Sequence, residues 1–304
     1  MIKKYGLGLF FYVIALLTYF VTRDAYILGN FIYIGTVIII GLKIYYRPGI
    51  KYKNIARSFI QFGVGMYMLV VITLILRENV QLEAFLINIL AILGGNIATF
   101  TTASVMHYFV AKTIGVIAIG RNWCGWACWY PAIFELFPYR KSKGRHRKLQ
   151  IIPYITLCIT ILLAVSIFFN SNLREKYNIH VIGITLISAA VYYIIGVILI
   201  FVTKDNRAIC KYFCPVPIIQ KIFMPISLFY IKTNINKCID CKKCEKQCGM
   251  DINITKYIAN NQNVTAPSCI QCRKCVESCK MGALSIGFGL KKGKSKEYIN
   301  YYKE

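Results

Sequence analysis

The sequence predicts an all-α polytopic membrane domain followed by a small, cysteine-rich α+β domain. Three observations support this division: long apolar runs fill the first two thirds of the chain, basic residues gather between those runs, and cysteines crowd near the carboxyl end. Of 304 residues 57% are hydrophobic, and the mean hydropathy is +0.53, yet the formal net charge is +25. This combination is typical of a membrane protein, which places its apolar runs in lipid and its basic residues outside them.

Apolar stretches of about 20 residues, enough to cross a bilayer, predict five straight spans. They lie near residues 6–22, 26–44, 58–76, 149–169 and 181–202. A further apolar region, 83–120, is too long for one straight helix and contains paired glycines and a polar run. We therefore expect about six transmembrane helices, one of them broken or re-entrant and sheltered by protein.

Basic residues in the short loops predict the orientation of these spans. Basic loops alternate with poorly charged ones along the chain, and loops rich in lysine and arginine stay in the cytoplasm. We expect a multi-pass protein of the bacterial cytoplasmic membrane, with both termini and the cysteine-rich domain in the cytoplasm. Anionic membrane lipid and acidic redox partners then account for the positive charge, and no nucleic-acid partner is expected.

Eight of the thirteen cysteines lie in two runs, CIDCKKCEKQC and CIQCRKCVESC, each spaced C-x2-C-x2-C-x3-C. This is the ligand spacing of a bacterial-type ferredoxin that holds two [4Fe-4S] clusters, in which the fourth cysteine of each run ligates the other cluster. Zinc favours two separated C-x2-C pairs, and disulfides do not persist in the cytoplasm. The predicted ligands are Cys238, Cys241, Cys244 and Cys279 for the first cluster, and Cys269, Cys272, Cys275 and Cys248 for the second.

The sequence thus predicts four parts. They are a transmembrane domain (1–215), a linker (216–235), a two-cluster ferredoxin domain (236–290) and a basic tail (291–304).

Two further cysteine pairs lie in the stretches RNWCGWACWYP and RAICKYFCPVP, at the predicted cytoplasmic membrane face. They are Cys124 with Cys128 and Cys210 with Cys214, and a four-residue spacing on a helix would place both sulfurs of a pair on one side. The four thiols could hold a third iron–sulfur or metal centre, or act as redox dithiols. The three tryptophans of the first stretch are expected at headgroup depth, where they would anchor and screen this site.

Polar residues at membrane depth are functional candidates. His107 is the only histidine expected there. His107 and Asn96 could form a quinone head-group site, or His107, close to Lys112, could simply lie near the membrane interface. A bis-histidine haem needs two facing ligands, so no haem is expected.

Cys158, alone in an apolar span, is expected to be a small packing residue.

These motifs together resemble those of the NapH-type membrane polyferredoxins. An arginine-led aromatic C-x3-C stretch, a C-x3-C-P stretch after the last span, and a two-cluster tail with CGMDINI and ALSIGF carry the resemblance, over about residues 83 to 290. Relatives of this family include NosR-type regulators and the ferredoxin-like assembly protein of cbb3 oxidases. The resemblance implies a cytoplasmic-membrane protein that moves electrons between the quinone pool, cytoplasmic donors and a partner redox system. No flavin-binding domain of the NosR kind is found in the sequence, so no flavin is expected.

We therefore expect an electron-transfer subunit of an oxidoreductase system, with no catalytic residue of its own. Its expected partners are membrane lipid, quinone and other redox proteins, such as a ferredoxin, a flavoprotein or a quinone-linked complex. Two alternatives stay open. One is an assembly or metal-handling reductase whose C-x3-C sulfurs bind an ion such as copper, and the other is a redox-sensing regulator.

Overall fold

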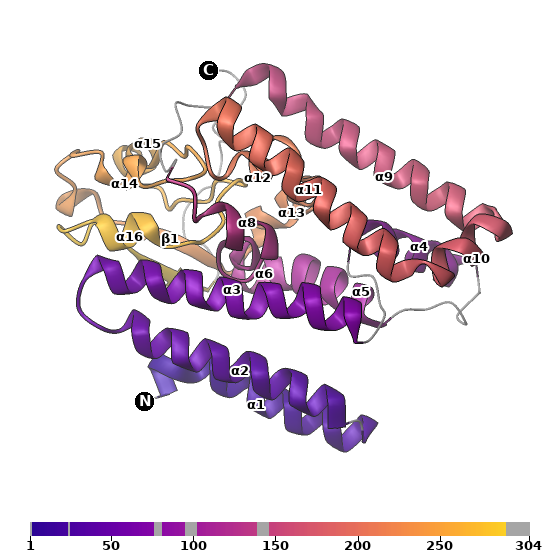
Figure 1. Cartoon of the computed structure of the whole chain (residues 1–304). Helices are drawn as coiled ribbons and strands as arrows, with labels where there is room; N and C mark the ends of the chain where they lie inside the picture. The colour runs from indigo at the N-terminus through magenta and orange to yellow at the C-terminus, as the bar shows by residue number, and fades with distance from the viewer. Residues whose placement is uncertain (1, 24, 76–80, 95–101, 139–145, 290–304) are drawn as a thin grey trace.

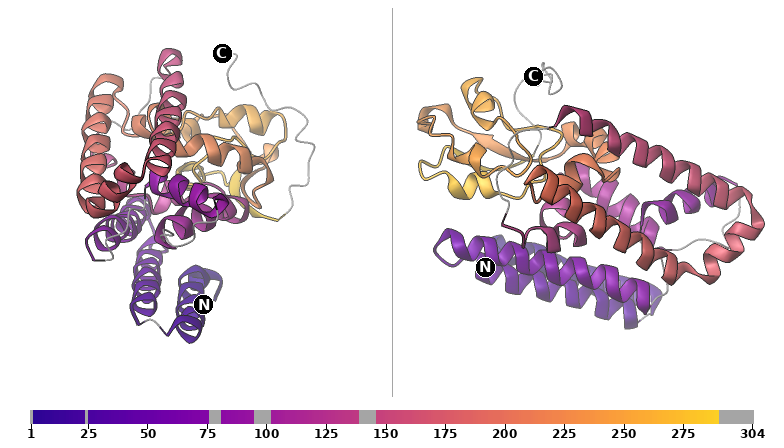
Figure 2. Two further views of the ribbon diagram at one scale, coloured as in Figure 1. Left: turned by 90° about the vertical axis from the view of Figure 1, so that its right-hand side faces the viewer. Right: turned by 45° about the horizontal axis from the view of Figure 1, so that its top comes forward.

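The computed structural model describes residues 2–23, 25–75, 81–94, 102–138 and 146–289, and all structural statements below refer to these ranges. Long helices run roughly side by side over most of the molecule (Figure 1), and the cysteine-rich region lies at one end of them. The second view in Figure 2 shows the same arrangement, with the orange and yellow segments gathered beyond the ends of the long helices.

The first three helices pack in chain order: α1 (Ile2–Thr22), α2 (Ala25–Tyr45) and α3 (Ile50–Leu74). Small residues allow α1 and α2 to approach closely. A Cβ added at Gly8 would lie 3.1 Å from the Gly35 carbonyl oxygen, and one at Gly35 would lie 3.0 Å from that of Gly8. Close packing of this kind is typical of helices in lipid, where no hydrophobic force drives them together.

Four helical stretches among the described residues are long and apolar enough to cross a membrane. They are Ala25–Tyr45, Ile50–Val71, Arg147–Phe169 and Val181–Thr203. The last two include α9 (Ile152–Phe169) and α11 (Val181–Thr203), which are joined through α10 (Ser171–Ile179). The protein is therefore mostly helical and has the spans of a membrane protein.

The predicted count of six spans is not confirmed. The first expected span lies within α1, but its described apolar stretch, Tyr5–Val21, is not among these four candidate spans. The region 83–120 is divided into α4 (Leu82–Leu93) and a second helical part, and neither is long enough alone. That second part consists of α5 (Thr102–Val105), a π-helix η2 (Met106–Ile114) and α6 (Gly115–Ile119).

Short helices lie between the long ones and the cysteine-rich region. They are α7 (Asn122–Trp126), α8 (Trp129–Phe134), η3 (Arg147–Ile151), α12 (Ala208–Tyr212), α13 (Val216–Phe223) and η4 (Met224–Ile226). Trp129, Phe134, Ile200 and Ile209 belong to one buried apolar cluster here. This cluster joins α8 to α11 and α12, and so fixes both C-x3-C stretches against the same helix.

The cysteine-rich region contains a two-stranded antiparallel sheet and short helices. Strand β1 (Phe229–Thr233) pairs with β2 (Leu284–Phe288), so that Ile231 lies opposite Ile286. The helical turns are η5 (Ile235–Lys237), α14 (Lys243–Lys246), α15 (Ile254–Ala259) and α16 (Lys274–Ser278). The segment 216–235, expected as a linker, is folded: it contains α13 and β1, and its β1 is one of the two strands of this sheet.

Candidate functional site

The two cysteine runs have loops of the same backbone shape. Asp240 and Lys242 of the first run have φ angles of 49° and 55°, and Gln271 and Arg273 of the second have 52° and 64°. The positions are equivalent, because each lies two or four residues after the first cysteine of its run. Left-handed backbone is uncommon for such residues. Its repetition indicates that both loops fold around a group of the same shape.

Cys248, the last cysteine of the first run, lies among three cysteines of the second. Cys248, Cys269, Cys272 and Cys275 line one cavity of about 390 Å³, whose other walls include the apolar side chain of Ile231. The exchange is reciprocal, because Cys279, the last cysteine of the second run, lies near Cys244 of the first run. Burial raises the pKa of the Cys244 thiol to about 11, and negative charge at Cys279 is among the factors that raise it further.

The two exchanged cysteines also accept equivalent hydrogen bonds. The backbone N–H of Ile252 donates to Cys248 Sγ at 3.5 Å, and that of Ala283 donates to Cys279 Sγ at 3.3 Å. Each donor lies four residues after its cysteine. Hydrogen bonds to sulfur are among the features that set the potential of an iron–sulfur cluster.

The cavity between the runs fits a [4Fe-4S] cluster. It offers four thiols in otherwise apolar surroundings, as cysteine ligation of a cubane requires. Burial raises the pKa of Cys269 to about 12 and that of Cys248 to about 11. These thiols would stay protonated at neutral pH unless a metal held them as thiolates, because only the thiolate is a ligand.

Each C-x3-C pair forms a turn instead of one continuous helical face, which corrects the sequence prediction. Helix α7 ends at Trp126, two residues before Cys128, and α12 ends at Tyr212, two residues before Cys214. The N–H of Cys128 donates to Trp123 O at 3.0 Å, and the N–H of Cys214 donates to Ile209 O at 2.9 Å. In both turns the acceptor precedes the first cysteine of its pair, so the two stretches repeat one local fold.

The structure brings the two pairs together. Burial raises the pKa of Cys128 well above its ordinary value, and charges at Cys124, Cys210 and Cys214 raise it further. Burial likewise raises the pKa of Cys214 to about 12, with contributions from Cys210 and Cys124. The four thiols are therefore mutual neighbours. In the described part of the chain, no three His, Cys, Asp or Glu side chains are placed to ligate a single metal ion.

This four-cysteine site lies directly against the second cysteine run. A Cβ added at Gly125 would come within 2.3 Å of the Ile270 carbonyl oxygen and 3.3 Å of the Cys272 Cα atom. The indole N–H of Trp126 donates to Gln271 O at 3.1 Å. The backbones thus touch, and no other side chain fits between the two sites at this point.

A buried arginine connects the same two regions. The side chain of Arg121 has no solvent exposure, and it donates to Gln220 Oε1 at 3.1 Å and to Pro267 O at 3.2 Å. Gln220 Oε1 also lies 3.2 Å from Cys124 Sγ. The guanidinium group lies close enough to lower the pKa values of Cys210 and Cys269, although burial, the largest influence, raises both.

A carboxylate, Glu135, holds these parts together. It forms ion pairs with Arg57 of α3 and Arg207 at the start of α12, and Lys274 of α16 lies 3.5 Å away. Burial alone would raise the pKa of Glu135, but Arg207 and Arg57 outweigh it and hold the pKa well below its ordinary value. Arg207 Nη1 also donates to Cys124 O at 2.9 Å, which joins the two C-x3-C stretches.

Sequence reasoning did not identify the roles of these charged residues. A signal was present, because both stretches begin R-x2-C-x3-C, with Arg121 and Arg207 at matching positions. Glu135 is also one of only twelve acidic residues in a chain that has 37 lysines and arginines.

His107 lies against the tryptophans of the first C-x3-C stretch. Its ring stacks on Trp129 with centroids 5.2 Å apart and meets the edge of Trp123 at 4.9 Å. His107 is buried, and its Nε2 atom has no hydrogen-bond partner. Lys112 Nζ lies 5.2 Å from the Trp129 ring. Asn96, the other predicted quinone contact, lies outside the described residues.

The prediction of a tryptophan belt is wrong for Trp129. This side chain is 1% exposed and belongs to the buried cluster beside α11. Inside the protein its ring contacts the His107 ring and the Nζ atom of Lys112. Cys158, by contrast with the expected packing role, is exposed on the surface of α9.

Two family models match the chain in the parts just described. Residues 237–284 match a 4Fe-4S dicluster domain, which covers all eight cysteines of the two runs. Residues 108–146 and 187–229 match a 4Fe-4S binding domain, which covers both C-x3-C pairs.

Relatives come from an archaeon and a bacterium. The chain is 30% identical over 217 residues to the uncharacterized protein MJ0750 of Methanocaldococcus jannaschii, covering 65% of this chain and 87% of MJ0750. It is 29% identical over 168 residues to MJ0749 of the same organism, covering 51% of this chain and 62% of MJ0749. It is 27% identical over 181 residues to the putative electron transport protein YccM of Escherichia coli, covering 51% of this chain and 49% of YccM.

The chain thus spans less than two thirds of MJ0749 and about half of YccM. No solved structure matches it significantly.

Proposed function

The chain belongs to the same protein family as MJ0750 of Methanocaldococcus jannaschii, and from this premise we propose how its iron–sulfur sites are used. Its 4Fe-4S matches and its similarity to YccM mark it as an iron–sulfur electron-transfer protein with membrane helices. More narrowly, we propose a NapH-type polyferredoxin that relays electrons between the quinone pool or a cytoplasmic donor and a partner redox system.

Two [4Fe-4S] clusters are proposed for the carboxyl-terminal region, with exchanged fourth ligands. The cavity lined by Cys248, Cys269, Cys272 and Cys275 supports this ligand set for one cluster. The proximity of Cys279 to Cys244 supports the other set, which Cys238 and Cys241 complete. When bound, such clusters supply one-electron transfer. The proposed ferredoxin domain is 236–290, joined to the membrane domain 1–215 by the folded segment 216–235.

Cys124, Cys128, Cys210 and Cys214 are proposed to hold a third iron–sulfur centre. Their gathering in one buried site supports this, and so does the 4Fe-4S binding-domain match over both pairs. The single observation that carries the relay is the contact of Gly125 with Ile270 and Cys272. Electron tunnelling weakens steeply with distance, and this backbone contact holds the four-cysteine site directly against the second run.

We propose a cytoplasmic-membrane location, with the ferredoxin region in the cytoplasm. The alternation of basic and poorly charged loops supports it. His107 is proposed to contact a quinone head group through Nε2, and the unpartnered state of that buried atom supports the assignment.

Metal analysis of the whole protein tests this function. The full chain is purified without oxygen, and its iron and acid-labile sulfide are compared with those of a variant in which Cys124, Cys128, Cys210 and Cys214 are all serine. We expect the variant to lose about four irons and four sulfides and to keep the remaining clusters. The exposed Cys158→Ser variant is the matched control and should lose none. Equal iron in all three proteins would contradict a third centre.

A further inference from the structure

The two cysteine runs share one loop shape but differ in how much of it the described chain covers. Ile239 and Ile270 occupy the same position, directly after the first cysteine of each run. Ile270 is 3% exposed, whereas Ile239 is 63% exposed. The second cysteine of the first run, Cys241, is exposed, and its counterpart Cys272 is partly buried. The first run therefore has an open face where the second has a covered one.

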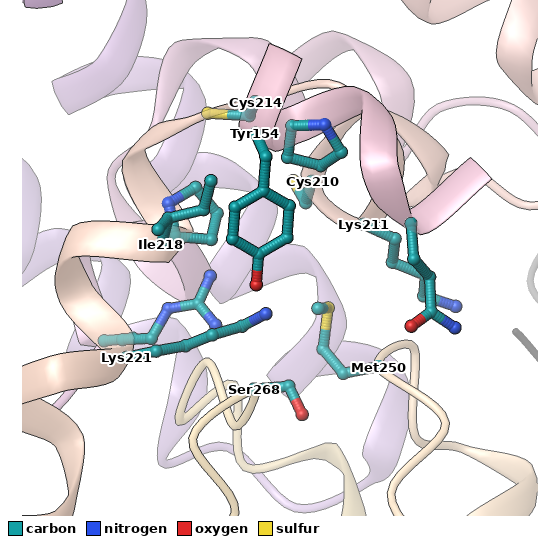
Figure 3. A pocket seen from close by; sticks show the side chains of 12 residues that line it. Tyr154, Cys210, Lys211, Cys214, Ile218, Lys221, Met250 and Ser268 are labelled. Atoms are coloured by element: carbon teal, nitrogen blue, oxygen red, sulfur yellow. The ribbon is translucent and has the colours of Figure 1, made fainter. Parts of the chain in front are cut away.

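A pocket beside the second run shows that this side faces the membrane part (Figure 3). Cys210 and Cys214 of the four-cysteine site line it together with Met250 and Ser268. Met250 and Ser268 each lie within two residues of a cysteine proposed for the second cluster. The second cluster site is therefore the inner one, next to the four-cysteine site, and the first cluster site is the outer one.

The contacts on the covered run show how such a loop meets another protein surface. A glycine of the first C-x3-C stretch lies against the backbone of Ile270. The guanidinium of Arg273 lies 5.2 Å from the centre of the Trp126 ring, and Lys274 Nζ lies 3.5 Å from Glu135. The membrane part thus offers a small residue, an aromatic ring and a carboxylate to three positions of one loop.

The same three positions of the first run are open. They are Ile239, Lys242 and Lys243, all of them exposed, and we call their surface the outer face. A partner that met the outer face in the same way would place a carboxylate at Lys243, as Glu135 does at Lys274. The fold itself thus supplies a template for the missing contact.

The charge around the outer face favours an acidic partner. The exposed lysines of the first run, or directly beside a cysteine proposed for the first cluster, are Lys237, Lys242, Lys243, Lys246 and Lys280. None of them forms an ion pair with a described residue. Of the two acidic residues in this run, Glu245 is turned onto Thr255, whose N–H and hydroxyl donate to it at 2.8 and 2.6 Å. Only Asp240 is exposed beside the lysines.

We propose that the outer face docks a small acidic redox protein, with a carboxylate of the partner at Lys243 and an apolar contact at Ile239. This inference rests on the proposed electron-transfer function and makes the first cluster the point where electrons enter or leave. One electron crosses at each encounter, so that one protein is oxidised as the other is reduced, and no bond changes. A second copy of this chain is disfavoured as the partner, because two chains of net charge +25 repel each other.

The test measures binding of the full chain, purified without oxygen in an uncharged detergent, to a purified acidic [2Fe-2S] ferredoxin. A basic c-type cytochrome is the probe of opposite charge. The test variant combines Lys242→Gln with Lys243→Gln. Its matched control combines Lys51→Gln with Lys148→Gln, which removes the same charge from two exposed lysines outside the cysteine runs. Iron content verifies that each variant keeps its clusters.

We expect the original protein to bind the ferredoxin at about 0.01 M salt, to release it at about 1 M, where exposed charges are screened, and not to bind the cytochrome. The test variant should bind about threefold to tenfold more weakly, and the control should bind as the original does. Ile239→Ser should also weaken binding, but without changing its dependence on salt.

Equal loss of affinity in both double variants would mean that the overall charge attracts the ferredoxin, and the proposal would be overturned. It would also be overturned if the outer face mediated self-association or adsorption to phosphatidylglycerol vesicles, lost only in the test variant, while the ferredoxin did not bind. Iron analysis and reduction by dithionite, which needs no docking, test the clusters separately. If both are normal and the ferredoxin still fails to bind, the docking proposal fails and the electron-transfer function stands.

Discussion

Gly125 and Ile270 pack backbone against backbone, so closely that a Cβ at Gly125 would come within 2.3 Å of the Ile270 carbonyl oxygen. One residue belongs to the first C-x3-C stretch and the other to the second cysteine run. Only glycine allows this approach, and the contact brings the two cysteine sites together directly, backbone to backbone.

Gly125→Ala should push these two sites apart. Overpacking of this kind costs about 1 to 3 kcal/mol, so we expect a lower unfolding temperature and slower electron transfer between the membrane part and the carboxyl-terminal clusters. Gly183→Ala is the matched control, because it is also helical and its added Cβ would meet nothing within 4 Å. Thermal unfolding and stopped-flow reduction measure the two effects. Identical behaviour of both variants would show that the close contact has no role.

Double variants should reveal the exchange of ligands between the runs. If Cys248 shares a cluster with Cys272, then Cys248→Ser combined with Cys272→Ser should lose no more iron than Cys272→Ser alone, because both changes remove the same cluster. Cys248→Ser combined with Cys241→Ser should lose both clusters. Iron analysis and electron paramagnetic resonance of the reduced proteins measure this. The reverse pattern would mean that each run ligates its own cluster.

Removing the charge of Arg121 should lower the reduction potentials of the neighbouring centres. A cation near a cluster favours its reduced, more negative state, and Arg121 lies beside Cys269 and Cys210. We therefore expect more negative potentials in Arg121→Gln and values near the original in Arg121→Lys. Lys232→Gln, on the exposed side of β1, is the control. Redox titrations followed by electron paramagnetic resonance give the potentials, and a shift to more positive values would refute the assignment.

Glu135→Gln should destabilise the protein strongly. The substitution leaves Arg57 and Arg207 buried without their anion, at a cost of about 3 to 5 kcal/mol. Glu175→Gln, exposed on α10, should cost almost nothing. Thermal unfolding of the three proteins in one detergent compares them.

The depressed pKa of Glu135 determines how the stability difference between the original protein and Glu135→Gln depends on pH. A carboxyl group with a lowered pKa in the folded state contributes stability above its unfolded pKa and loses it as the pH falls through the folded one. The gap between the original protein and Glu135→Gln should therefore stay constant from about pH 5 to about pH 8. A gap that closed within this range would mean that Glu135 is protonated in the folded protein.

Labelling of single introduced cysteines should place the two ends of the helices on opposite sides of the membrane. Figure 1 shows α10 at the end of the molecule away from α14 and α16. In a cysteine-light background, Leu173→Cys on α10 should react with an impermeant reagent added outside, and Lys237→Cys should react only after permeabilisation. Both residues are exposed, so both should react in detergent. Outside labelling of Lys237→Cys would reverse the proposed orientation.

The chemistry of this chain was predictable because metal ligands carry local spacing. The two runs predicted a 4Fe-4S region, and the dicluster match over 237–284 confirms it. The C-x3-C turns were not predictable from spacing alone, since helix and turn both tolerate it. Pro215 follows Cys214 directly and disfavours a helix through that cysteine, yet Cys128 makes the same turn without a proline.

Contacts between distant segments were beyond the reach of sequence patterns. Nothing local indicates that Glu135 meets Arg57 and Arg207, because an ion pair depends on where the chain returns in three dimensions. The count of six spans stays unconfirmed for a related reason. The apolar residues in 83–120 do not reveal whether a helix there faces lipid or another helix. In the structure α4 packs against α9 and ends after twelve residues.

The docking of the second cysteine run over Gly125 also sets an order for biogenesis. Cys124 and Cys210 come from segments on either side of two candidate spans, so the four-cysteine site exists only after both spans have been inserted. The segment that covers it, around Ile270, is translated later still. A nascent chain therefore passes through a stage in which its membrane part is complete and the site is uncovered. The third centre proposed above would be loaded in that interval, before the segment around Ile270 covers the site.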